Sequence, residues 1–224
     1  TVKNLTKVYQ ILMELLNARG FSDESLSRHI SNKLLEYKCK QFITNEQSGD
    51  ISKSMSGYID IYIYQKIKTY VKFFNINFKI KLSILIDNYK FLINTHDMDD
   101  NDEMIFVFLQ ENFTDAEKED IIQFETMFHN VRNFHYKNLM LNITKHKLVP
   151  QHSLYSGDKT LLYKKLQIFN DEQLPYISHQ DPICKFYNFK MDDIIKIDRN
   201  CTSYKVLSTY RIVKPVNLCS PTSF

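Results

Sequence analysis

Apolar residues recur every three or four positions at the start of the chain, which is the spacing of a helix that buries one face. They are Leu5, Val8, Leu12, Leu15 and Leu16. Gly20 follows at the point where such a helix would end. The polar residues 22–25 predict the cap of a second helix running to Leu35, and the polar stretch 45–57 predicts an exposed loop.

The pattern then changes to the two-residue alternation of a β-strand. Isoleucine occupies every second position between Tyr58 and Tyr64. The stretches 80–86, 104–109 and 139–143 are also rich in apolar and β-branched residues and are predicted to be strands. Helices and strands therefore mix in the first part of the chain, which predicts an α/β or α+β domain.

Residues 142–214 predict a second, smaller α+β domain. One helix is expected after the polar residues 156–158, because Leu162, Leu166 and Phe169 follow at helical spacing. Another should begin at Asp181-Pro182, since aspartate accepts hydrogen bonds from free backbone amides and proline fits the first turn. Residues 194–197 and 206–213 predict the two strands of a hairpin.

The chain is therefore expected to be α+β, with domains at 1–141 and 142–214 and a loose tail at 215–224. At 224 residues and 43% hydrophobic composition, it is long enough for two small hydrophobic cores.

The charge distribution argues against a free-standing DNA-binding protein. Residues 142–214 carry 12 Lys/Arg against 7 Asp/Glu, and residues 1–141 carry 17 against 19. Tight binding of nucleic acid by counterion release requires a concentrated basic face, which neither part offers.

Composition also bears on the cellular compartment. No stretch approaches the ~20 apolar residues that cross a bilayer, and the first residues lack a signal pattern. Four cysteines without a C-x-x-C pair predict reduced thiols. Two alanines beside abundant Ile, Asn, Lys, Tyr and Phe suit an AT-rich genome, such as that of a protist or a large DNA virus. We expect an intracellular protein without a membrane partner, nuclear if cellular, and in the virion or host cytoplasm if viral.

The segment from His146 to His152 has the most informative pattern, H-x-L-V-P-x-H. Histidine is the commonest metal ligand, so a metal site is one interpretation. A zinc site needs three or four ligands, however, and no cysteine lies nearby. Pro150 also favours an extended backbone that would separate the two histidines. Packing or surface hydrogen bonding is the simpler expectation.

Together with later landmarks, this segment resembles the assembly module of the fifth-subunit family of eukaryotic-type DNA-dependent RNA polymerases, which has an archaeal counterpart. The matching landmarks, in order, are Asn142-Ile143-Thr144, residues 146–152, Leu161-Leu162, residues 172–177, Asp181-Pro182-Ile183, residues 194–197, Arg199 and Tyr210-Arg211. Three positions where the family has glycine carry Asn188, Asp192 and Lys205. Asn and Asp tolerate left-handed backbone well, whereas Lys205 suggests a different hairpin turn.

The resemblance implies a non-catalytic subunit with a mixed-sheet assembly domain that docks on the largest polymerase subunit and a neighbouring small subunit. The assembly residues it implies are His146, Leu148, Val149, Pro150, His152, Leu174, Pro175, Asp181, Pro182, Arg199, Tyr210 and Arg211. No catalytic residue, cofactor, metal or small-molecule substrate is expected, because nucleotide addition belongs to the large subunits.

Residues 1–141 carry a weaker resemblance to the family's jaw domain, which lies beside downstream duplex DNA. It implies that the turn holding Asn112, Thr114 and Lys118 is close to DNA. Yet Thr114 to Glu117 is also a capping box, which predicts an ordinary capped surface helix. Residues 97–125 hold 11 acids against one lysine, so direct phosphate contact is in doubt.

Two other functions compete with the subunit hypothesis. The first is a stand-alone DNA-associated regulator that uses the same assembly fold. The second is a metal nuclease, which would need an Asp and an E-x-K unit on adjacent strands. The only E-x-K, at residues 36–38, is in a stretch predicted to be helical, and Asp87 with Lys90 near a predicted strand end lacks a second acid.

Overall fold

The computed structural model describes residues 2–21, 60–63, 67–99, 102–199 and 207–215. The chain divides into two compact units, Thr1–Leu141 and Asn142–Phe224. The helix predicted after residue 22, the loop at 45–57, the E-x-K unit, Lys205 and the tail beyond Pro215 lie outside the described residues.

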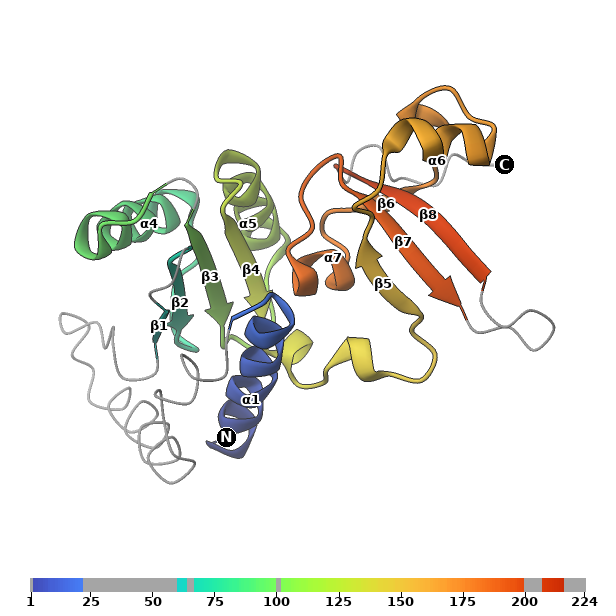
Figure 1. Ribbon diagram of the computed structural model, residues 1–224. Coiled ribbons are helices and arrows are strands. Elements are labelled where there is room, and N and C mark those ends of the chain that lie inside the picture. The colour runs from blue at the N-terminus through green and yellow to red at the C-terminus, as the bar shows by residue number, and fades with distance from the viewer. Residues whose placement is uncertain (1, 22–59, 64–66, 100–101, 200–206, 216–224) are drawn as a thin grey trace. The chain divides into compact units, whose positions relative to one another are not determined.

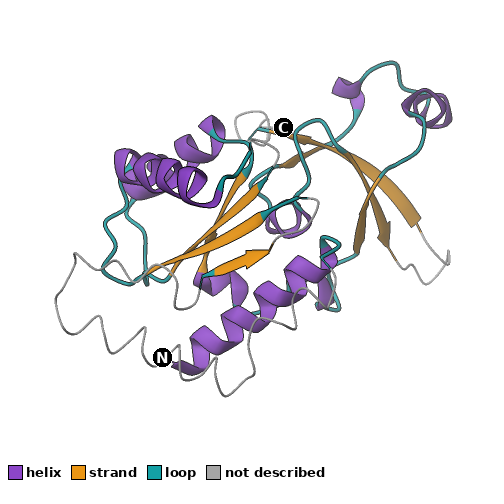
Figure 2. Ribbon diagram, turned by 60° about the vertical axis from the view of Figure 1, so that its left-hand side comes forward, coloured by secondary structure: helices purple, strands orange, loops and turns teal. Residues whose placement is uncertain are grey.

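The first unit is built on a four-stranded mixed sheet with the strand order β1-β2-β3-β4. The strands are β1 (Ile61–Ile63), β2 (Thr69–Phe74), β3 (Glu103–Phe108) and β4 (Val131–His135). β1 pairs antiparallel with β2, and the other neighbours are parallel. Helices α4 (Leu82–His96) and α5 (Asp115–Met127) lie on one face, and α1 (Val2–Ala18) lies on the other (Figures 1 and 2).

Coverage on both faces explains why every residue of β2 and β3 is buried. Aromatic rings fill the layer between the sheet and α4 and α5. Phe106 stacks on Phe124 with ring centroids 5.6 Å apart, and Tyr89 meets Phe124 edge-on at 6.0 Å. Each such side chain contributes roughly 1.5–3 kcal/mol through burial alone. The aromatic residues thus hold α4 and α5 to the sheet.

Two strand predictions in this unit are wrong. Residues 82–96 form α4, whose buried positions Leu85, Tyr89 and Leu92 are spaced four and three apart. The short Lys-Ile alternation before them imitates a strand, but the longer helical period prevails. Residues 139–143 form no strand: they join two 3-10 turns, Tyr136–Leu139 and Ile143–Lys145. Asn142 caps the second turn by accepting from the Thr144 amide.

The second unit contains a four-stranded mixed sheet in the order β5-β7-β8-β6. Its strands are β5 (Gln151–Leu154), β6 (Tyr176–Ser178), β7 (Ile194–Arg199) and β8 (Leu207–Lys214). β7 pairs antiparallel with β5 and β8, whereas β6 runs parallel to β8. The predicted α+β fold, mixed sheet and β7–β8 hairpin strands are confirmed.

Each face of this sheet has its own hydrophobic cluster. Ile195, Ile197 and Val213 pack with Ile183 and Cys184 of α7 (Pro182–Tyr187). On the opposite face, Ile194 and Ile212 pack with Leu162 of α6 (Lys159–Leu166) and with Leu174, which follows the 3-10 turn Asp171–Gln173. The alternation of strand side chains thus fixes both helices on one small sheet.

Two of the positions predicted to need a left-handed backbone have one. Asn188 ends α7 with φ 55°, and Asp192 lies in the following turn with φ 65°. Asparagine and aspartate are the non-glycine residues that enter this region at least cost. The turns therefore form without the family's glycines.

Candidate functional site

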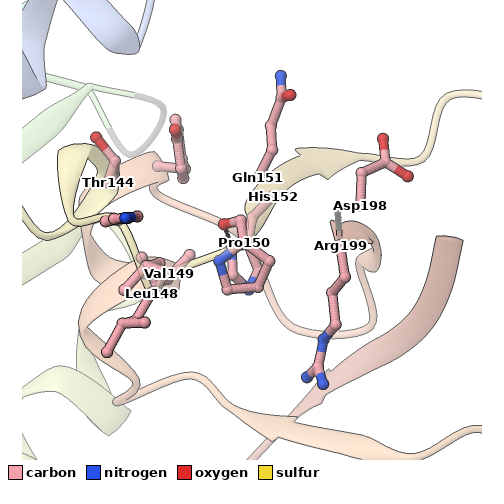
Figure 3. Close-up of a pocket in the computed structure, with 11 residues that line it drawn as sticks. Thr144, Leu148, Val149, Pro150, Gln151, His152, Asp198 and Arg199 are labelled. Atoms are coloured by element: carbon pink, nitrogen blue, oxygen red, sulfur yellow. Dashed lines mark hydrogen bonds between the residues drawn. The ribbon is translucent and has the colours of Figure 1, made fainter. Parts of the chain in front are cut away.

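A groove of about 890 Å³ lies in the second unit, beside the H-x-L-V-P-x-H segment (Figure 3). Its lining comes from the segment itself, the start of β5, one side of α7 and the end of β7. The lining residues are Thr144, Lys147, Leu148, Val149, Pro150, Gln151, His152, Ile183, Tyr187, Asp198 and Arg199. Five of the twelve predicted assembly residues are therefore brought together: Leu148, Val149, Pro150, His152 and Arg199.

His146 shapes the tight turn at the rim of the groove. The Val149 amide donates to the His146 carbonyl at 2.9 Å, and the Leu148 amide donates to His146 Nδ1 at 3.3 Å. The turn leaves the Leu148 side chain 83% exposed. An apolar side chain held in solvent by a braced turn is suited to insertion into a partner surface.

His152 makes a separate local bond at the start of β5. Its Nδ1 lies 2.8 Å from the Pro150 carbonyl, which can only accept, so Nδ1 carries the proton (Figure 3). In the described part of the chain, no three His, Cys, Asp or Glu side chains gather in a possible metal site. The absence of metal remains a prediction, and the structure assigns each histidine a role in its own turn.

The His152 bond and its burial give a testable pH dependence. Burial lowers the pKa of His152 from its ordinary value near 6.5. The hydrogen bond to Pro150 and the charge of Asp181 raise this pKa, and the charges of Arg199 and Arg211 lower it, so that the net shift is downward. Because the folded pKa is below the unfolded one, the unfolded state binds more protons between the two values. Stability contributed by neutral His152 should therefore be lost as pH falls from 6.5 through the folded pKa. NMR titration, with the ring resonance assigned from His152→Gln, measures this, and a midpoint at or above 6.5 would contradict it.

The charged groups of the groove are unevenly paired. Asp198 accepts from Lys196 Nζ at 2.8 Å and Ser208 Oγ at 2.6 Å, and these two bonds lower its pKa. Its side chain points away from that of Arg199 (Figure 3). Among the described residues, no ion pair joins Arg199 or Lys147 to an acid. The groove therefore combines an apolar side with two cations, and it is complementary to a partner with apolar and acidic groups.

The remaining predicted assembly residues support the fold. Leu174 is only 4% exposed, so its side chain has no surface for a partner. The Pro175 carbonyl accepts from the Ile212 amide at 3.0 Å, and Arg211 Nη1 donates to the Tyr176 carbonyl at 3.3 Å. Tyr210 packs on the α6-side cluster. These residues hold β6 against β8, away from the groove lining.

Asp181 and Pro182 act as the predicted helix opening. Asp181 Oδ1 accepts from the Ile183 amide at 2.8 Å, and Pro182 occupies the first turn of α7. Because α7 supplies Ile183 and Tyr187 to the groove, the cap also positions part of its wall.

Replacing Asp181 with alanine should lower the free energy of unfolding by about 1 kcal/mol, because one amide at the start of α7 loses its acceptor. Denaturant unfolding of the full chain measures the change. Asp181→Asn keeps an acceptor oxygen and should retain most of the stability, so an equal loss in both variants would contradict the capping role.

The residues predicted to be DNA-proximal come together at the start of α5, but their polar groups are already engaged. Thr114 and Glu117 form the predicted capping box, in which Glu117 Oε2 accepts from the Thr114 amide and hydroxyl, both at 2.8 Å. Lys118 Nζ lies 2.7 Å from Asp115 Oδ1. Asn112 is exposed. With two acids in the first turn, this end of the helix is poorly suited to phosphate.

One positioning residue in this region was missed. His135 Nε2 donates to the Gln110 carbonyl at 2.7 Å, while its Nδ1 accepts from the Lys137 amide at 3.2 Å. Lys137 Nζ also donates to the Glu111 carbonyl at 2.7 Å. The loop before Asn112 is thus fixed to the end of β4, a contact for which the sequence gives no local signal.

The groove residues that were not predicted differ in how far the sequence indicates them. Thr144, Lys147 and Gln151 are close in sequence to the predicted assembly residues, whereas Asp198 reaches the groove through the pairing of β7 with β5. Tyr187 is different, because it follows Ile183 by four positions on α7 and so shares its face. Helical spacing from the Asp181 cap could have identified it.

Of the residues named for the nuclease hypothesis, the structure describes Asp87 and Lys90, whereas the E-x-K unit at residues 36–38 lies outside the described residues. Asp87 and Lys90 lie within α4, so their predicted place near a strand end is wrong.

In the described part of the chain, no helix is both long and apolar enough to cross a membrane.

Comparison with known proteins gives one family-model match, which lies almost entirely in the second unit, and several similar proteins. Residues 141–213 match the model of the RNA polymerase Rpb5 C-terminal domain. DNA-directed RNA polymerase V subunit 5A of Arabidopsis thaliana is 39% identical over 69 residues, covering 30% of this chain and 31% of that protein. The polymerase I, II and III subunit rpabc1 of Dictyostelium discoideum is 28% identical over 107 residues, covering 47% and 54%. The corresponding subunit RPABC1 of Caenorhabditis elegans is 30% identical over 83 residues, covering 37% and 39%.

The chain thus covers between 31% and 54% of the lengths of these relatives. The family-model match at residues 141–213 contains the groove lining, helices α6 and α7, and all but the last residue of the second sheet. The second unit is thus similar to the C-terminal domain of the RNA polymerase subunit Rpb5.

Proposed function

We propose that this protein is a non-catalytic subunit of a multisubunit DNA-dependent RNA polymerase. The observation that carries the proposal is the groove lined by residues 144, 147–152, 183, 187, 198 and 199. It lies within the stretch that matches the Rpb5 C-terminal domain and holds five predicted assembly residues. The relatives named above are polymerase subunits, so the partners of this chain are other polymerase subunits, within the cell or a virion.

The second unit docks on the largest polymerase subunit and a neighbouring small subunit. The braced Leu148 turn offers an apolar contact, and the cations Lys147 and Arg199 offer charge complementarity to acidic partner groups. The residues around Leu174 and Tyr210 contribute by holding the sheet in shape.

The first unit forms part of the jaw near downstream duplex DNA. The capped, acidic start of α5 supports a role as a spacer or protein contact more than direct phosphate binding. We therefore expect the purified chain alone to bind duplex DNA weakly at physiological salt. Nanomolar binding in a salt titration would favour the stand-alone regulator, because tight non-specific binding needs a strong basic surface.

Affinity purification of the tagged full chain, followed by identification of the co-purifying proteins, tests the central proposal. We expect the large polymerase subunits in stoichiometric amounts. A preparation that captures no polymerase subunit would reject the proposal, and Mg²⁺-dependent cleavage of DNA by the purified chain would point to the nuclease.

A further inference from the structure

Among the described strands of the second sheet, β5 lies at one edge and pairs only with β7. It begins inside the groove, because Gln151 and His152 belong to both. No described strand of this unit pairs with its other long side (Figure 1). The edge is therefore continuous with the candidate docking groove.

The ladder between β5 and β7 determines which backbone groups face outward. The Tyr155 amide donates to the Ile194 carbonyl at 2.8 Å, so this residue pair is hydrogen-bonded. In an antiparallel pair such positions alternate, so Gln151 and Ser153 also face β7. The amides and carbonyls of His152 and Leu154 consequently point away from the sheet.

The opposite side of β7 gives the same alternation. The Val213 amide donates to the Asp193 carbonyl at 3.0 Å. The backbone amides and carbonyls of odd-numbered β7 residues therefore face β8, and those of even-numbered residues face β5. Among the described residues, no backbone hydrogen bond reaches the outward groups of His152 or Leu154. The edge thus offers two donors and two acceptors at the two-residue repeat of an extended chain.

This edge lacks the usual protection against strand addition. Residues 151–154 contain no lysine or proline, and their register with β7 is unbroken by a bulge. Leu154 adds an apolar side chain that is 52% exposed. Residues 207–211 of β8 also pair with no described strand on the β6 side. There, however, the Arg211 side chain donates to the Tyr176 carbonyl beside the open edge.

We propose that β5 receives an extended segment of a partner polypeptide as a fifth strand of the sheet. A partner helix would have no free backbone groups to offer, because its amides and carbonyls bond to each other. Nucleic acid does not present amides and carbonyls at the two-residue repeat of a strand. The outward backbone groups of His152 and Leu154 therefore fit an extended polypeptide best. The segment carries an apolar side chain against Leu154 and acidic side chains toward Lys147 and Arg199. The inference rests on the proposed function, since the partner is the polymerase subunit that docks in the groove.

A proline substitution tests the backbone contact directly. Leu154→Pro removes an amide hydrogen that points outward and leaves the donors to β7 in place. Leu154→Ala removes the apolar side chain but keeps the amide, and it is the matched control. We expect Leu154→Pro to recover at least about tenfold less polymerase from cells than Leu154→Ala, equivalent to about 1.4 kcal/mol.

Hydrogen exchange supplies a second measurement and guards against a folding artefact. In the free chain, the Ser153 and Tyr155 amides should exchange at the same slow rate in Leu154→Pro as in Leu154→Ala. In the purified complex of the native chain, the His152 and Leu154 amides should become protected. No added protection, or equal recovery of polymerase by both variants, would reject strand addition.

The outcomes separate this inference from the proposed function. If Leu154→Pro retains polymerase while a change in the groove lining loses it, the subunit role stands and strand addition falls. A β5-mediated dimer of the isolated chain, detected by sedimentation and abolished by Leu154→Pro, would identify a second copy as the occupant and overturn the proposal.

Discussion

Replacing Asp60 with asparagine is expected to destabilise the first unit by about 3–5 kcal/mol, because it leaves a buried cation without its counter-charge. Asp60 accepts from Tyr70 Oη at 3.0 Å, Lys72 Nζ at 3.1 Å and the Phe73 amide at 3.0 Å. The side chains of the ion pair, Asp60 and Lys72, are only 5% and 8% exposed. Denaturant unfolding of the full chain, followed by circular dichroism, measures the loss, and hydrogen exchange in β2 assigns it to the first unit.

Two further variants make this result specific. Asp60→Asn combined with Lys72→Met removes the orphaned cation and should recover a large part of the stability, since apolar groups often replace buried pairs without loss. Lys118→Gln breaks an exposed pair whose side chains are 56% and 93% exposed, and little change is expected. Equal losses in the single and double Asp60 variants would show that the buried cation is not the cause.

The second large effect is expected in the groove. Leu148→Asp combined with Arg199→Glu replaces the apolar contact with a charge and reverses the sign of a rim residue. Both side chains are exposed, so the fold should be retained. Anchors at interface centres commonly contribute about 2 kcal/mol or more, so recovered polymerase should fall by roughly tenfold or more.

Leu161→Asp is the matched control for this variant. Leu161 is also an exposed leucine of the second unit, at 62%, but it lies on α6 outside the groove lining. The Leu161→Asp substitution also adds a negative charge, but it should leave the recovery of polymerase unchanged. Equal recovery by the groove variant and the control would place the docking surface elsewhere.

Sequence reasoning succeeded where local chemistry determines the structure. The caps at Thr114 and Asp181 need only a side-chain acceptor and the next few amides, so both could be predicted. The left-handed turns at Asn188 and Asp192 follow from steric preferences of single residues. Alternation in residues 61–63 also predicted β1, whose isoleucines are buried.

Prediction from the sequence failed where the structure depends on pairing between segments that are far apart in the chain. β2 and β4 are buried on both faces, so neither shows the alternation that reveals a half-exposed strand. The short strands β5 and β6 owe their conformation to β7 and β8. For the same reason Asp198 and Gln151, which meet across a strand pair, could not be assigned to one groove in advance.

The strand order of the second sheet has a consequence for how the protein is made. Among the strands that the structure describes, β8 comes last in the sequence, lies inside the sheet and is the only one that pairs with β6. During synthesis, β5 and β7 can pair as soon as residue 199 has left the ribosome, but β6 has no strand to join until residues 207–214 follow. The nascent second unit therefore passes through a stage with two exposed edges. A chaperone, or the partner subunit itself, would find it most accessible in that interval.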